Sequence, residues 1–427
     1  MPSIKSIAII GLGYVGLPIA LLASKKGYAV FGIDNDIEKI KSLAKKKSYI
    51  GDITDKEVAD TYAIFTNDAS KSGEVDAVII CVPTPVSPEK IPDLRPVKSA
   101  VSAVAPYIKK GTLIVIESTV NPGVCDEVVT PLLEEESGKK VGKDIYLAHC
   151  PERINPGDPK WNVSNISRVV GANSQLELDL ALELYRNLID AEIKPMGTIK
   201  EAEAVKIVEN SFRNVNIAFV NELAMSFHKL GINLENVIEG AATKPFAFMP
   251  NHPGCGVGGH CIPVDPYYLI EYAHDHGFEH EFLRLSSNIN ESMPRFTVDL
   301  LIEGLNDIGL PLKDTKVAML GLSYKANVGD TRESPSKVIK DLLLEAGAIL
   351  TVYDPYITAK STVGSLNEAL AGSAAIVIAT GHDEFKNIDV DLLKQSGVRV
   401  VIDGRNILRY KKDNLKKNGI IYTGIGI

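Results

Sequence analysis

The stretch IAIIGLGYVGLP at residues 7–18 joins an apolar run to a turn that contains three glycines. We expect Ser6–Ile10 to form a buried strand and the residues after Gly16 to form a helix. A second apolar run, Ala29–Ile33, ends at the acid Asp34. Glycines between a strand and a helix, with an acid at the end of the following strand, are typical of a dinucleotide-binding unit.

This turn predicts how a cofactor binds. Glycine lets the backbone come close to a pyrophosphate at the helix N-terminus, where unpaired N–H groups favour an anion. Asp34 would accept hydrogen bonds from the adenosine ribose hydroxyls and repel a 2′-phosphate, so NAD is expected over NADP. A flavin site and a purely structural turn are the alternatives. The predicted contacts in the turn are Gly11, Leu12, Gly13, Tyr14, Val15 and Gly16.

Two further apolar runs end in loops that contain a threonine, at residues 82–85 and 117–120. Ligands bind at the carboxyl edge of a parallel sheet. We therefore expect both loops to line the nicotinamide half of the cofactor site, with ordinary loop hydroxyls as the alternative. The residues concerned are Val82, Pro83, Thr84 and Thr119.

The rest of the chain repeats and then interrupts this pattern. Apolar runs alternate with helical ones at both ends, which predicts parallel sheets with crossover helices. Between them, Glu201–Leu230 contains neither glycine nor proline and predicts one helix of about thirty residues, closed by Gly231. The expected fold is α/β: two Rossmann-like doubly wound parallel-sheet domains joined by a central helical segment with one long helix. The predicted domains are residues 1–197, 198–308 and 309–427.

The predicted strands beyond the first two are Ala77–Val82, Leu113–Glu117, Ile145–Ala148, Lys316–Leu320, Ile349–Tyr353, Ala375–Ala379, Val398–Ile402 and Ile420–Tyr422.

Composition excludes several classes of protein. With 427 residues the chain is too long for a single core. A net charge of −8 argues against a nucleic-acid partner. The five cysteines form no CxxC pair, which favours reduced thiols in the cytoplasm. The uncharged stretch Ile7–Ser24 is broken by glycines and a proline, so we expect no membrane span.

A second informative stretch is PGCGVGGHCIPVDP, residues 253–266. Its four glycines allow the backbone to approach a ligand closely. Asp265 and Pro266 predict the N-cap and first position of a helix through Tyr267–His274. Cys261 would then lie just outside a helix N-terminus, where the partial positive charge favours the thiolate. A buried cysteine in a glycine-rich turn is the alternative.

The long helix carries a polar stripe. Lys206 and Asn210 are spaced i, i+4 and project from one side, and Arg213 and Asn214 extend the stripe. Surface-facing polar side chains are the alternative. The apolar flanks instead predict a largely buried segment, in which a lysine requires an anionic partner or a depressed pKa. These flanks are Ala202, Ala204, Val205, Ile207 and Val208.

Together these residues indicate an oxidation that continues from an alcohol to an acid. The first step needs a hydride acceptor, a base and donors for the developing oxyanion. The second step needs the aldehyde to be captured as a tetrahedral adduct. A cysteine does this through a thiohemiacetal, which is oxidised to a thioester and hydrolysed. NAD, Cys261, Lys206 and Asn210 fit these steps.

The motifs resemble the nucleotide-sugar 6-dehydrogenases, the UDP-glucose/UDP-N-acetylhexosamine dehydrogenase group, over essentially the whole chain. The family architecture implies an NAD domain, a central dimerising segment and a UDP-binding domain, and hence a UDP-sugar substrate and a homodimer or higher homo-oligomer. The motifs are GLGYVGLP (11–18), CVPTP (81–85), ESTVNPG (117–123), PER (151–153), EAVKIVENSF (203–212), GGHCIPVDP (258–266), KANVGDTRESP (325–335) and DGRN (403–406).

The resemblance also implies roles for single residues. Cys261 would be the nucleophile, and Glu152 the carboxylate for thioester hydrolysis. Lys206 and Asn210 would hold the oxyanion and position water. Asp265, alongside Thr119, would orient or activate that water, and whether it or Lys206 is the principal acid/base stays open. Arg332 would reach the cofactor. The implied substrate contacts are Glu152, Arg153, Lys206, Asn210, Arg213, Lys244, Phe246, Gly258, Tyr324 and Lys325.

The sugar is less clearly indicated. The loop Lys244–Pro250 resembles family members that oxidise UDP-N-acetylglucosamine, and Phe246, Phe248 and Met249 would form a wall for the acetamido methyl. His260 and Val264 depart from the pattern of glucose-specific members. UDP-N-acetylmannosamine enzymes share GGHCIPVDP, so that epimer is the first alternative, followed by the galactosamine epimer and then UDP-glucose.

Three other interpretations account for part of the pattern. The β-hydroxyacid dehydrogenases also combine a Rossmann domain with a helix bearing K-x-x-x-N, but their single oxidation needs no Cys261. A regulator that has lost activity would be expected to lack Cys261 or Lys206. A zinc site from His252, Cys255, His260 and Cys261 would depend on adjacent residues that chelate poorly, so no metal is expected.

Overall fold

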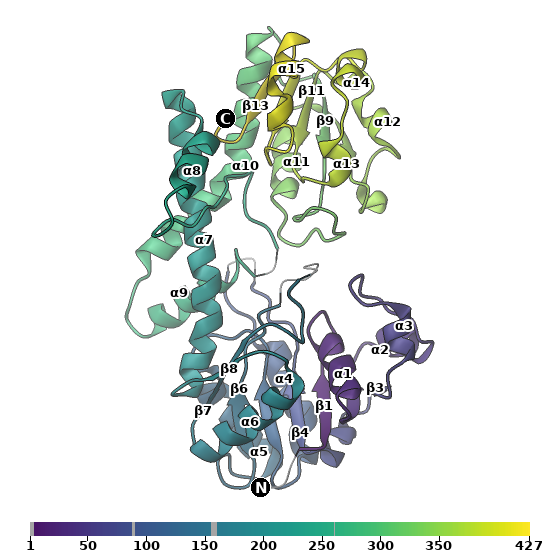
Figure 1. Ribbon diagram of the computed structural model, residues 1–427, viewed down its shortest axis with the longest axis vertical. Helices are drawn as coiled ribbons and strands as arrows, with labels where there is room; N and C mark the ends of the chain where they lie inside the picture. Colours follow the sequence, from purple (N-terminus) through teal and green to yellow (C-terminus); the bar gives the residue numbers. More distant parts are fainter. Residues whose placement is uncertain (1–3, 88–89, 155–159, 260) are drawn as a thin grey trace. The chain divides into compact units, whose positions relative to one another are not determined.

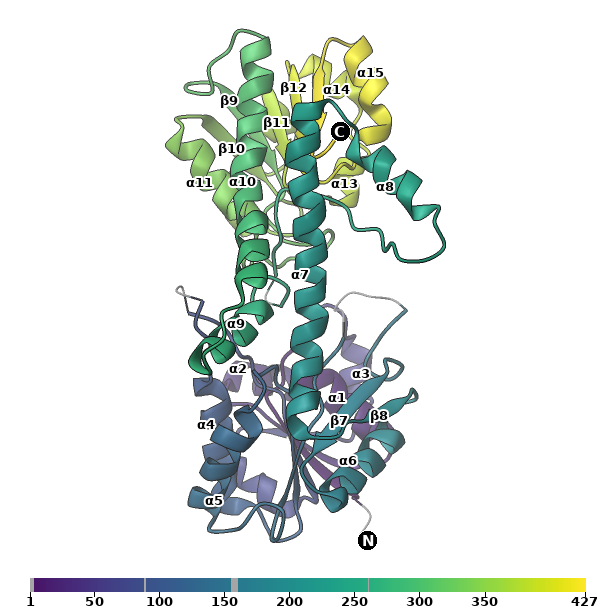
Figure 2. The same ribbon diagram turned by 90° about the vertical axis from the view of Figure 1, so that its left-hand side faces the viewer.

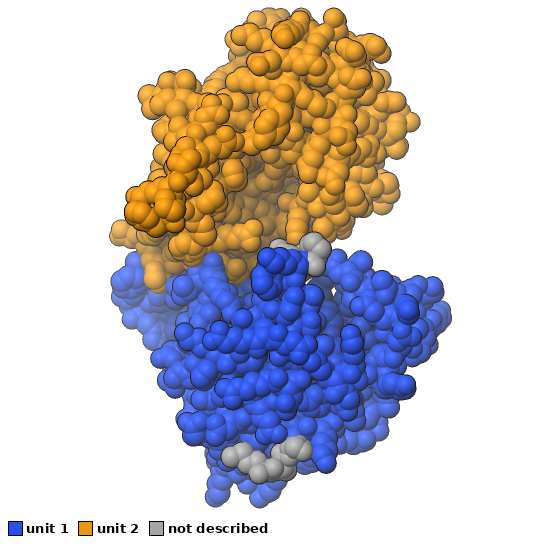
Figure 3. Space-filling model, in the orientation of Figure 1, with its two compact units in different colours: residues 1–209, 267–279 blue, residues 210–266, 280–427 orange. Residues whose placement is uncertain are grey.

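The computed structural model describes residues 4–87, 90–154, 160–259 and 261–427. The chain forms two compact units, coloured separately in Figure 3. Unit 1 comprises residues 1–209 and 267–279, and unit 2 comprises residues 210–266 and 280–427. The helical middle of the chain is thus shared between the two units, and the three-part division at 197/198 and 308/309 stays a prediction.

Unit 1 is built on an eight-stranded sheet in the order β3-β2-β1-β4-β5-β6-β7-β8. Its first six strands follow the doubly wound order of dinucleotide-binding sheets. All strand pairs are parallel except β6 with β7. The strands are β1 (Ser6–Ile10), β2 (Ala29–Ile33), β3 (Ile64–Thr66), β4 (Ala77–Ile80), β5 (Leu113–Ile116), β6 (Tyr146–His149), β7 (Arg168–Ala172) and β8 (Ile193–Pro195).

Helices cover both faces of this sheet (Figure 1). Along β1, Ile7 and Ile9 enter one buried apolar cluster, whereas Ala8 and Ile10 enter another. Successive strand side chains point to opposite faces, so the sheet has a core on each side. The helices of unit 1 are α1 (Gly16–Lys25), α2 (Ile37–Ala44), α3 (Asp55–Ala59), α4 (Arg95–Val104), α5 (Thr130–Ser137) and α6 (Gln175–Leu188), with the short 3-10 helices η1 (Ala69–Glu74) and η2 (Ala105–Tyr107) and the π-helical segment η3 (Cys125–Val129). The helix α9 (Asp265–Asp275) begins in unit 2 and continues in unit 1.

The long helix α7 (Ile199–Leu230) has 32 residues, and its length is seen in Figure 2. Gly231 follows it with φ +67°, the left-handed conformation that commonly ends a helix. The helix contributes to both units, since the division between them falls after Glu209. In unit 2, Asn221 of α7 donates to Asn290 of α10 over 2.8 Å in a buried environment. The predicted helix of about thirty residues is confirmed.

Unit 2 holds a five-stranded parallel sheet in the order β10-β9-β11-β12-β13. Its strands are β9 (Lys316–Leu320), β10 (Ile349–Tyr353), β11 (Ala375–Ile378), β12 (Val400–Asp403) and β13 (Ile421–Gly424). Its helices are α8 (Leu234–Ala242), α10 (Glu281–Asp307), α11 (Pro335–Glu345), α12 (Leu366–Leu370), α13 (Asp383–Lys386), α14 (Val390–Gln395) and α15 (Lys412–Lys417), with the turns η4 (Thr358–Lys360) and η5 (Arg409–Lys411).

The predicted α/β fold is confirmed, with the sheet of unit 2 fully parallel and that of unit 1 parallel except between β6 and β7. The bounds of each predicted strand agree with those of an observed strand to within two residues, whereas β3, β7 and β8 were not predicted. Among the described residues, no helix combines the length and apolar character that crossing a membrane requires.

Candidate functional site

The glycine turn after β1 has a conformation that other residues would not tolerate. Gly11 has φ +91°, and its N–H donates to the Ile33 carbonyl over 2.8 Å. A Cβ on Gly16 would lie 1.9 Å from the Gly11 carbonyl oxygen. The turn is therefore packed directly against the start of α1.

The middle of the same turn is open. A Cβ on Gly13 would meet no protein atom within 4 Å. No side chain caps the first turn of α1. Leu17 and Ile19 already donate to the Gly13 and Val15 carbonyls over 3.2 and 3.3 Å, so the positive end of the helix, more than a row of free N–H groups, favours an anion here. An open backbone beside an uncapped helix N-terminus fits the pyrophosphate of NAD.

Asp34 is held at the end of β2. Its carboxylate is buried and accepts from the backbone N–H groups of Leu12 over 2.8 Å and Asp36 over 2.9 Å. The Lys39 ammonium on α2 forms an ion pair with it, also at 2.9 Å. Lys39 was not predicted as a site residue, although a lysine five residues after the acid is visible in the sequence.

This pair makes a cofactor prediction testable. In Asp34→Ser, the repulsion of a 2′-phosphate is lost and the Lys39 ammonium is left without its carboxylate. We expect the ratio of kcat/KM for NAD over NADP to fall by at least about tenfold, the effect of about 1.4 kcal/mol. Steady-state kinetics with both cofactors measure it, and Asp36→Ser is the matched control. Equal kcat/KM for NAD and NADP in the unmutated protein would contradict the role of Asp34.

The two threonine loops lie together. Ser118 donates to the Val82 carbonyl over 2.7 Å, and the Tyr268 hydroxyl donates to the Thr84 carbonyl over 2.6 Å. Thr84 and Thr119 are partly exposed. These contacts fix the backbone of both loops and leave their threonine hydroxyls available, whereas Pro83 is exposed.

Glu152 lies in a buried group of charges in unit 1. Its carboxylate is 2.7 Å from Nη2 of Arg168, whose Nη1 is 3.3 Å from Glu117. The hydroxyl of Tyr185 donates to Glu117. Burial raises the pKa of Glu117 to about 7, while the guanidinium acts in the opposite direction. Arg168 and Tyr185 were not predicted, because they are distant in sequence from the PER motif.

Arg153, predicted to contact substrate, is engaged within unit 1. Its guanidinium pairs with Glu209 on α7 and donates to the Ser167 carbonyl over 2.9 Å. The pair spans 56 residues of sequence and ties the loop after β6 to α7. Arg153 therefore has a structural partner of its own besides any bound anion.

In unit 2, three predicted catalytic residues lie together. Asn210 donates through Nδ2 to the carboxylate of Asp265, which is buried. The Asp265 backbone N–H donates to the Cys261 carbonyl over 2.8 Å, so the cysteine precedes the helix by one turn. Asp265 was predicted as the N-cap that precedes the helix, but α9 already includes Asp265 as its first residue. Cys261 is neither fully buried nor fully exposed.

Lys206 is half-buried on α7, one turn before Asn210. Among the described residues its ammonium forms no hydrogen bond or ion pair. The expectation of a largely buried segment is only partly right, because Val208 is 57% exposed while Ala202 and Ile207 are buried. A helix turns 100° per residue, so one side of an apolar run still faces outward.

The glycine-rich loop before Cys261 packs against other predicted residues of unit 2. A Cβ on Gly259 would lie 2.9 Å from the Tyr324 ring, and one on Gly258 would lie 2.7 Å from its Cβ. The Gly259 N–H donates to the carbonyl of Arg332 over 3.2 Å. The Arg332 guanidinium itself pairs with Asp330 at 2.6 Å. The loop and the segment 324–332 thus form one structure, and Lys325 is partly buried within it.

Arg405 was quoted within a motif but was not predicted as a site residue. Its Nε donates to the Ala379 carbonyl over 3.0 Å, and its Nη1 contacts the Gly256 carbonyl at 3.4 Å. The Cys255 N–H also donates to the Gly404 carbonyl over 3.0 Å. These bonds anchor the thiol loop to the C-terminal sheet.

Other predicted substrate contacts lie apart from the thiol loop. Arg213, Lys244 and Phe246 are exposed. The Lys244 ammonium lies 4.8 Å from the centroid of the Phe246 ring. Among the described residues, no hydrogen bond or ion pair joins these three to the Cys261 loop.

The zinc alternative has little support among the residues described. His252 contacts Glu235 at 2.8 Å, and Cys255 donates to the Ala379 carbonyl. His260 lies outside the described residues.

A different set of donor atoms, from Cys125, His149 and Glu203, lies within 4.8 Å of one another in the core of unit 1. There Glu203 of α7 accepts from the backbone N–H groups of Gly123 and Cys125 over 2.6 and 2.8 Å. These bonds connect the loop at residues 121–123 to α7.

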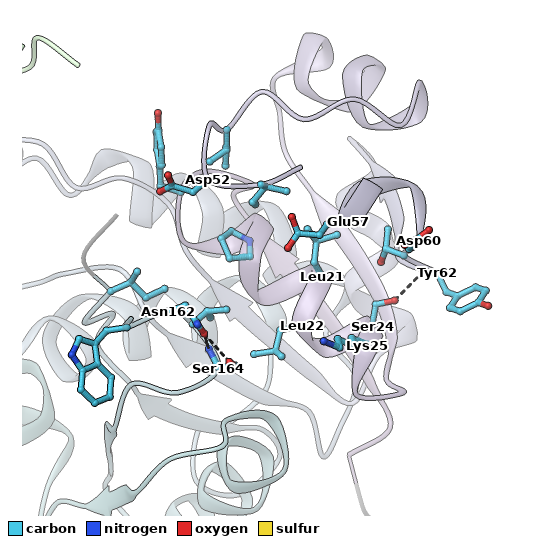
Figure 4. Close-up of a pocket in the computed structure, with 18 residues that line it drawn as sticks. Leu21, Leu22, Ser24, Lys25, Asp52, Glu57, Asp60, Tyr62, Asn162 and Ser164 are labelled. Atoms are coloured by element: carbon cyan, nitrogen blue, oxygen red, sulfur yellow. Dashed lines mark hydrogen bonds between the residues drawn. The ribbon is translucent and has the colours of Figure 1, made fainter. Parts of the chain in front are cut away.

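A pocket of about 1000 Å³ opens beside α1 in unit 1 (Figure 4). It is lined by α1 side chains such as Leu21 and Lys25, by the segment 50–62 and by residues 161–164. Tyr14 is the one predicted site residue in its wall. Its wall also includes Ile154, whose backbone N–H donates to the Glu152 carboxylate.

Comparison with known proteins identifies the parts of the chain. The UDP-glucose/GDP-mannose dehydrogenase family matches in three segments: its NAD binding domain over residues 5–189, its central domain over residues 200–292 and its UDP binding domain over residues 318–410. The resemblance inferred from the motifs is confirmed, and NAD is the cofactor.

Individual relatives are similar over almost their full length. UDP-N-acetyl-D-mannosamine dehydrogenase of Pyrococcus horikoshii is 37% identical, covering 98% of this chain and 99% of that protein. UDP-N-acetyl-D-glucosamine 6-dehydrogenase of Pseudomonas aeruginosa is 34% identical, with 96% and 99% covered. A solved structure of the UDP-D-ManNAc dehydrogenase of Pyrococcus horikoshii matches with a TM-score of 0.92 at 36% identity, covering 99% of each chain.

Proposed function

The chain belongs to the UDP-glucose/GDP-mannose dehydrogenase family, and we propose that it oxidises the C6 hydroxyl of a UDP-N-acetylhexosamine to a carboxylate in two NAD-dependent steps. The observation that supports this most directly is the pairing of Asn210 with Asp265, directly after the Cys261 loop. A thiol and a carboxylate one turn apart, with an amide from α7 bonded to the carboxylate, provide a nucleophile and a means to orient water.

In the first oxidation, bound NAD would supply the acceptor for the hydride that leaves C6. The residues that would hold it are the turn Gly11–Gly16 and Asp34. Lys206 and Asn210 stabilise the oxygen that loses its proton, because an ammonium and an amide N–H both donate to an oxyanion. Asp265 orients the water that carries the proton away.

In the second oxidation, the Cys261 thiolate adds to the aldehyde carbon and forms a thiohemiacetal. Loss of a second hydride from that carbon gives a thioester. Water then attacks the carbonyl carbon, Glu152 accepts a water proton, and the carbon–sulfur bond breaks to regenerate the thiolate.

The substrate class follows from the exposed loop Lys244–Pro250 and from the relatives. The loop presents Phe246 and Met249, which are 67% and 54% exposed and offer an apolar wall for an acetamido methyl. The sequence favours UDP-N-acetylglucosamine. The name of the Pyrococcus relative supports UDP-N-acetylmannosamine as the second candidate.

One experiment tests both the reaction and the sugar. NADH release and product are followed with a panel of UDP-N-acetylglucosamine, UDP-N-acetylmannosamine, UDP-N-acetylgalactosamine and UDP-glucose. We expect two NADH per sugar, a uronic acid and no free aldehyde. We also expect kcat/KM for an acetamido sugar to exceed that for UDP-glucose by about 10–200-fold, the range typical of one small apolar group.

Two results would contradict these expectations. One NADH per sugar with an aldehyde product would place the chain among single-step dehydrogenases. Turnover of UDP-glucose as fast as any acetamido sugar would refute the apolar wall. Turnover of UDP-N-acetylmannosamine alone would leave the mechanism intact and select the second candidate.

A further inference from the structure

The sheet topology of unit 1 brings one cation and two carboxylates together at a single edge. Glu117 directly follows β5, and Glu152 follows β6 by three residues. Arg168 is the first residue of β7, which runs antiparallel to β6. The start of β7 therefore lies at the edge where β5 and β6 end.

Contacts connect these residues in a row. Tyr185 of α6 donates to Glu117, Glu117 lies 3.3 Å from Nη1 of Arg168, and Nη2 of Arg168 lies 2.7 Å from Glu152. The side chains of Glu117 and Arg168 are fully buried, whereas that of Glu152 retains 9% exposure. Glu152 is thus the least buried end of the row, and its Oε1 also accepts from the backbone N–H groups of Arg153 and Ile154.

The row contains one guanidinium between two carboxylates. Two ionised carboxylates around one buried guanidinium would leave an uncompensated negative charge, which is costly away from water. Burial raises the pKa of Glu117 to about 7. A raised pKa of Glu117 therefore reduces the uncompensated charge of the row, in which the guanidinium contacts both carboxylates.

We propose that Arg168 is a positioning residue, whose guanidinium, itself held by Glu117 and Tyr185, fixes the Glu152 carboxylate for the attack of water on the thioester. This inference rests on the proposed function, since Glu152 has this task only if a thioester forms on Cys261. A base displaced by about 1 Å can lose about 100-fold in rate. The two oxidations precede this step and do not use Arg168.

The test uses Arg168→Lys, which keeps the positive charge but loses the planar fork that contacts two carboxylates at once. Steady-state turnover should fall by at least about tenfold. Stopped-flow traces should show a burst of two NADH per active site, and acid-quenched protein should carry a sugar adduct on Cys261 by mass spectrometry. Arg186→Lys, an exposed change beside Tyr185, is the control and should behave as the unmutated chain.

A merely structural Arg168 would lower activity without the burst and without the adduct, and this result would overturn the inference. Turnover within threefold of the unmutated chain would also overturn it. Glu152→Gln distinguishes failure of the inference about Arg168 from failure of the proposed role of Glu152. If it accumulates the adduct and Arg168→Lys does not, the inference fails alone. If neither accumulates it, the assigned role of Glu152 fails and the inference fails with it.

Removing the guanidinium can unfold a protein that depends on a buried ion pair. If circular dichroism shows that Arg168→Lys is not folded, Tyr185→Phe decides the question, because it removes only the hydroxyl that holds Glu117. Several-fold slower turnover with a detectable adduct is then expected. A burst and turnover equal to those of the unmutated chain would refute the proposal that Arg168, held by Glu117 and Tyr185, positions Glu152.

Discussion

Replacing Cys261 with serine should lower turnover by at least about 10³-fold while NAD and the UDP-sugar still bind. A serine hydroxyl is a weaker nucleophile than a thiolate near neutral pH, and its ester is hydrolysed less readily than a thioester. The backbone of the loop does not depend on the sulfur, since the Cys261 carbonyl accepts from Asp265 through main-chain atoms. Steady-state NADH production, together with calorimetric binding of both ligands, measures the effect.

The same loop offers a matched control. Cys255 is buried, and its thiol donates to the Ala379 carbonyl over 3.4 Å. A serine hydroxyl can make the same hydrogen bond, so Cys255→Ser should retain activity within a few-fold. If Cys261→Ser kept more than a tenth of the activity, Cys261 would not be the nucleophile. An equal loss in both variants would indicate damage to the loop rather than to the chemistry.

The fold was largely predictable because its central strands are short, continuous apolar runs. The strand that was hardest to recognise, β7, begins with Arg168, and its arginine suggests a loop. β3 and β8 have three residues each, and β8 contains a lysine and a proline. Short or polar edge strands are common, because they discourage pairing with another chain, and they leave little periodic signal in the sequence.

The candidate site was predictable where its residues are close in sequence. Asp265 lies four residues after Cys261, and Lys206 and Asn210 share one helix side, so spacing alone connects them. Lys39 is close to Asp34 in sequence but was not assigned a role, whereas Arg168 is connected to the site only through tertiary contacts. Arg168 is 51 residues from Glu117, and no local pattern indicates that an antiparallel strand returns it to that carboxylate.

The sequence also suggested that Lys206 lies in a buried environment, and this was only partly right. The lysine is half-buried, and its ammonium has no partner among the described residues. An unpaired ammonium on a helix that also carries Asn210 remains available to an external anion. This favours a direct role toward substrate over a structural ion pair.

Lys206→Met should therefore lower kcat/KM by about 10²–10⁴-fold, the range expected for loss of an oxyanion donor or a general acid. Methionine keeps the length and the apolar stem of lysine and removes only the charge, so α7 should fold normally. Kinetics on the favoured UDP-sugar, with NAD affinity measured separately, test this. Lys200→Met on the same helix is the control, because the Lys200 ammonium pairs on the surface with Glu127 at 3.0 Å. Near-normal activity in Lys206→Met would assign the acid/base role to Asp265, whereas an equal loss in both variants would point to α7 itself.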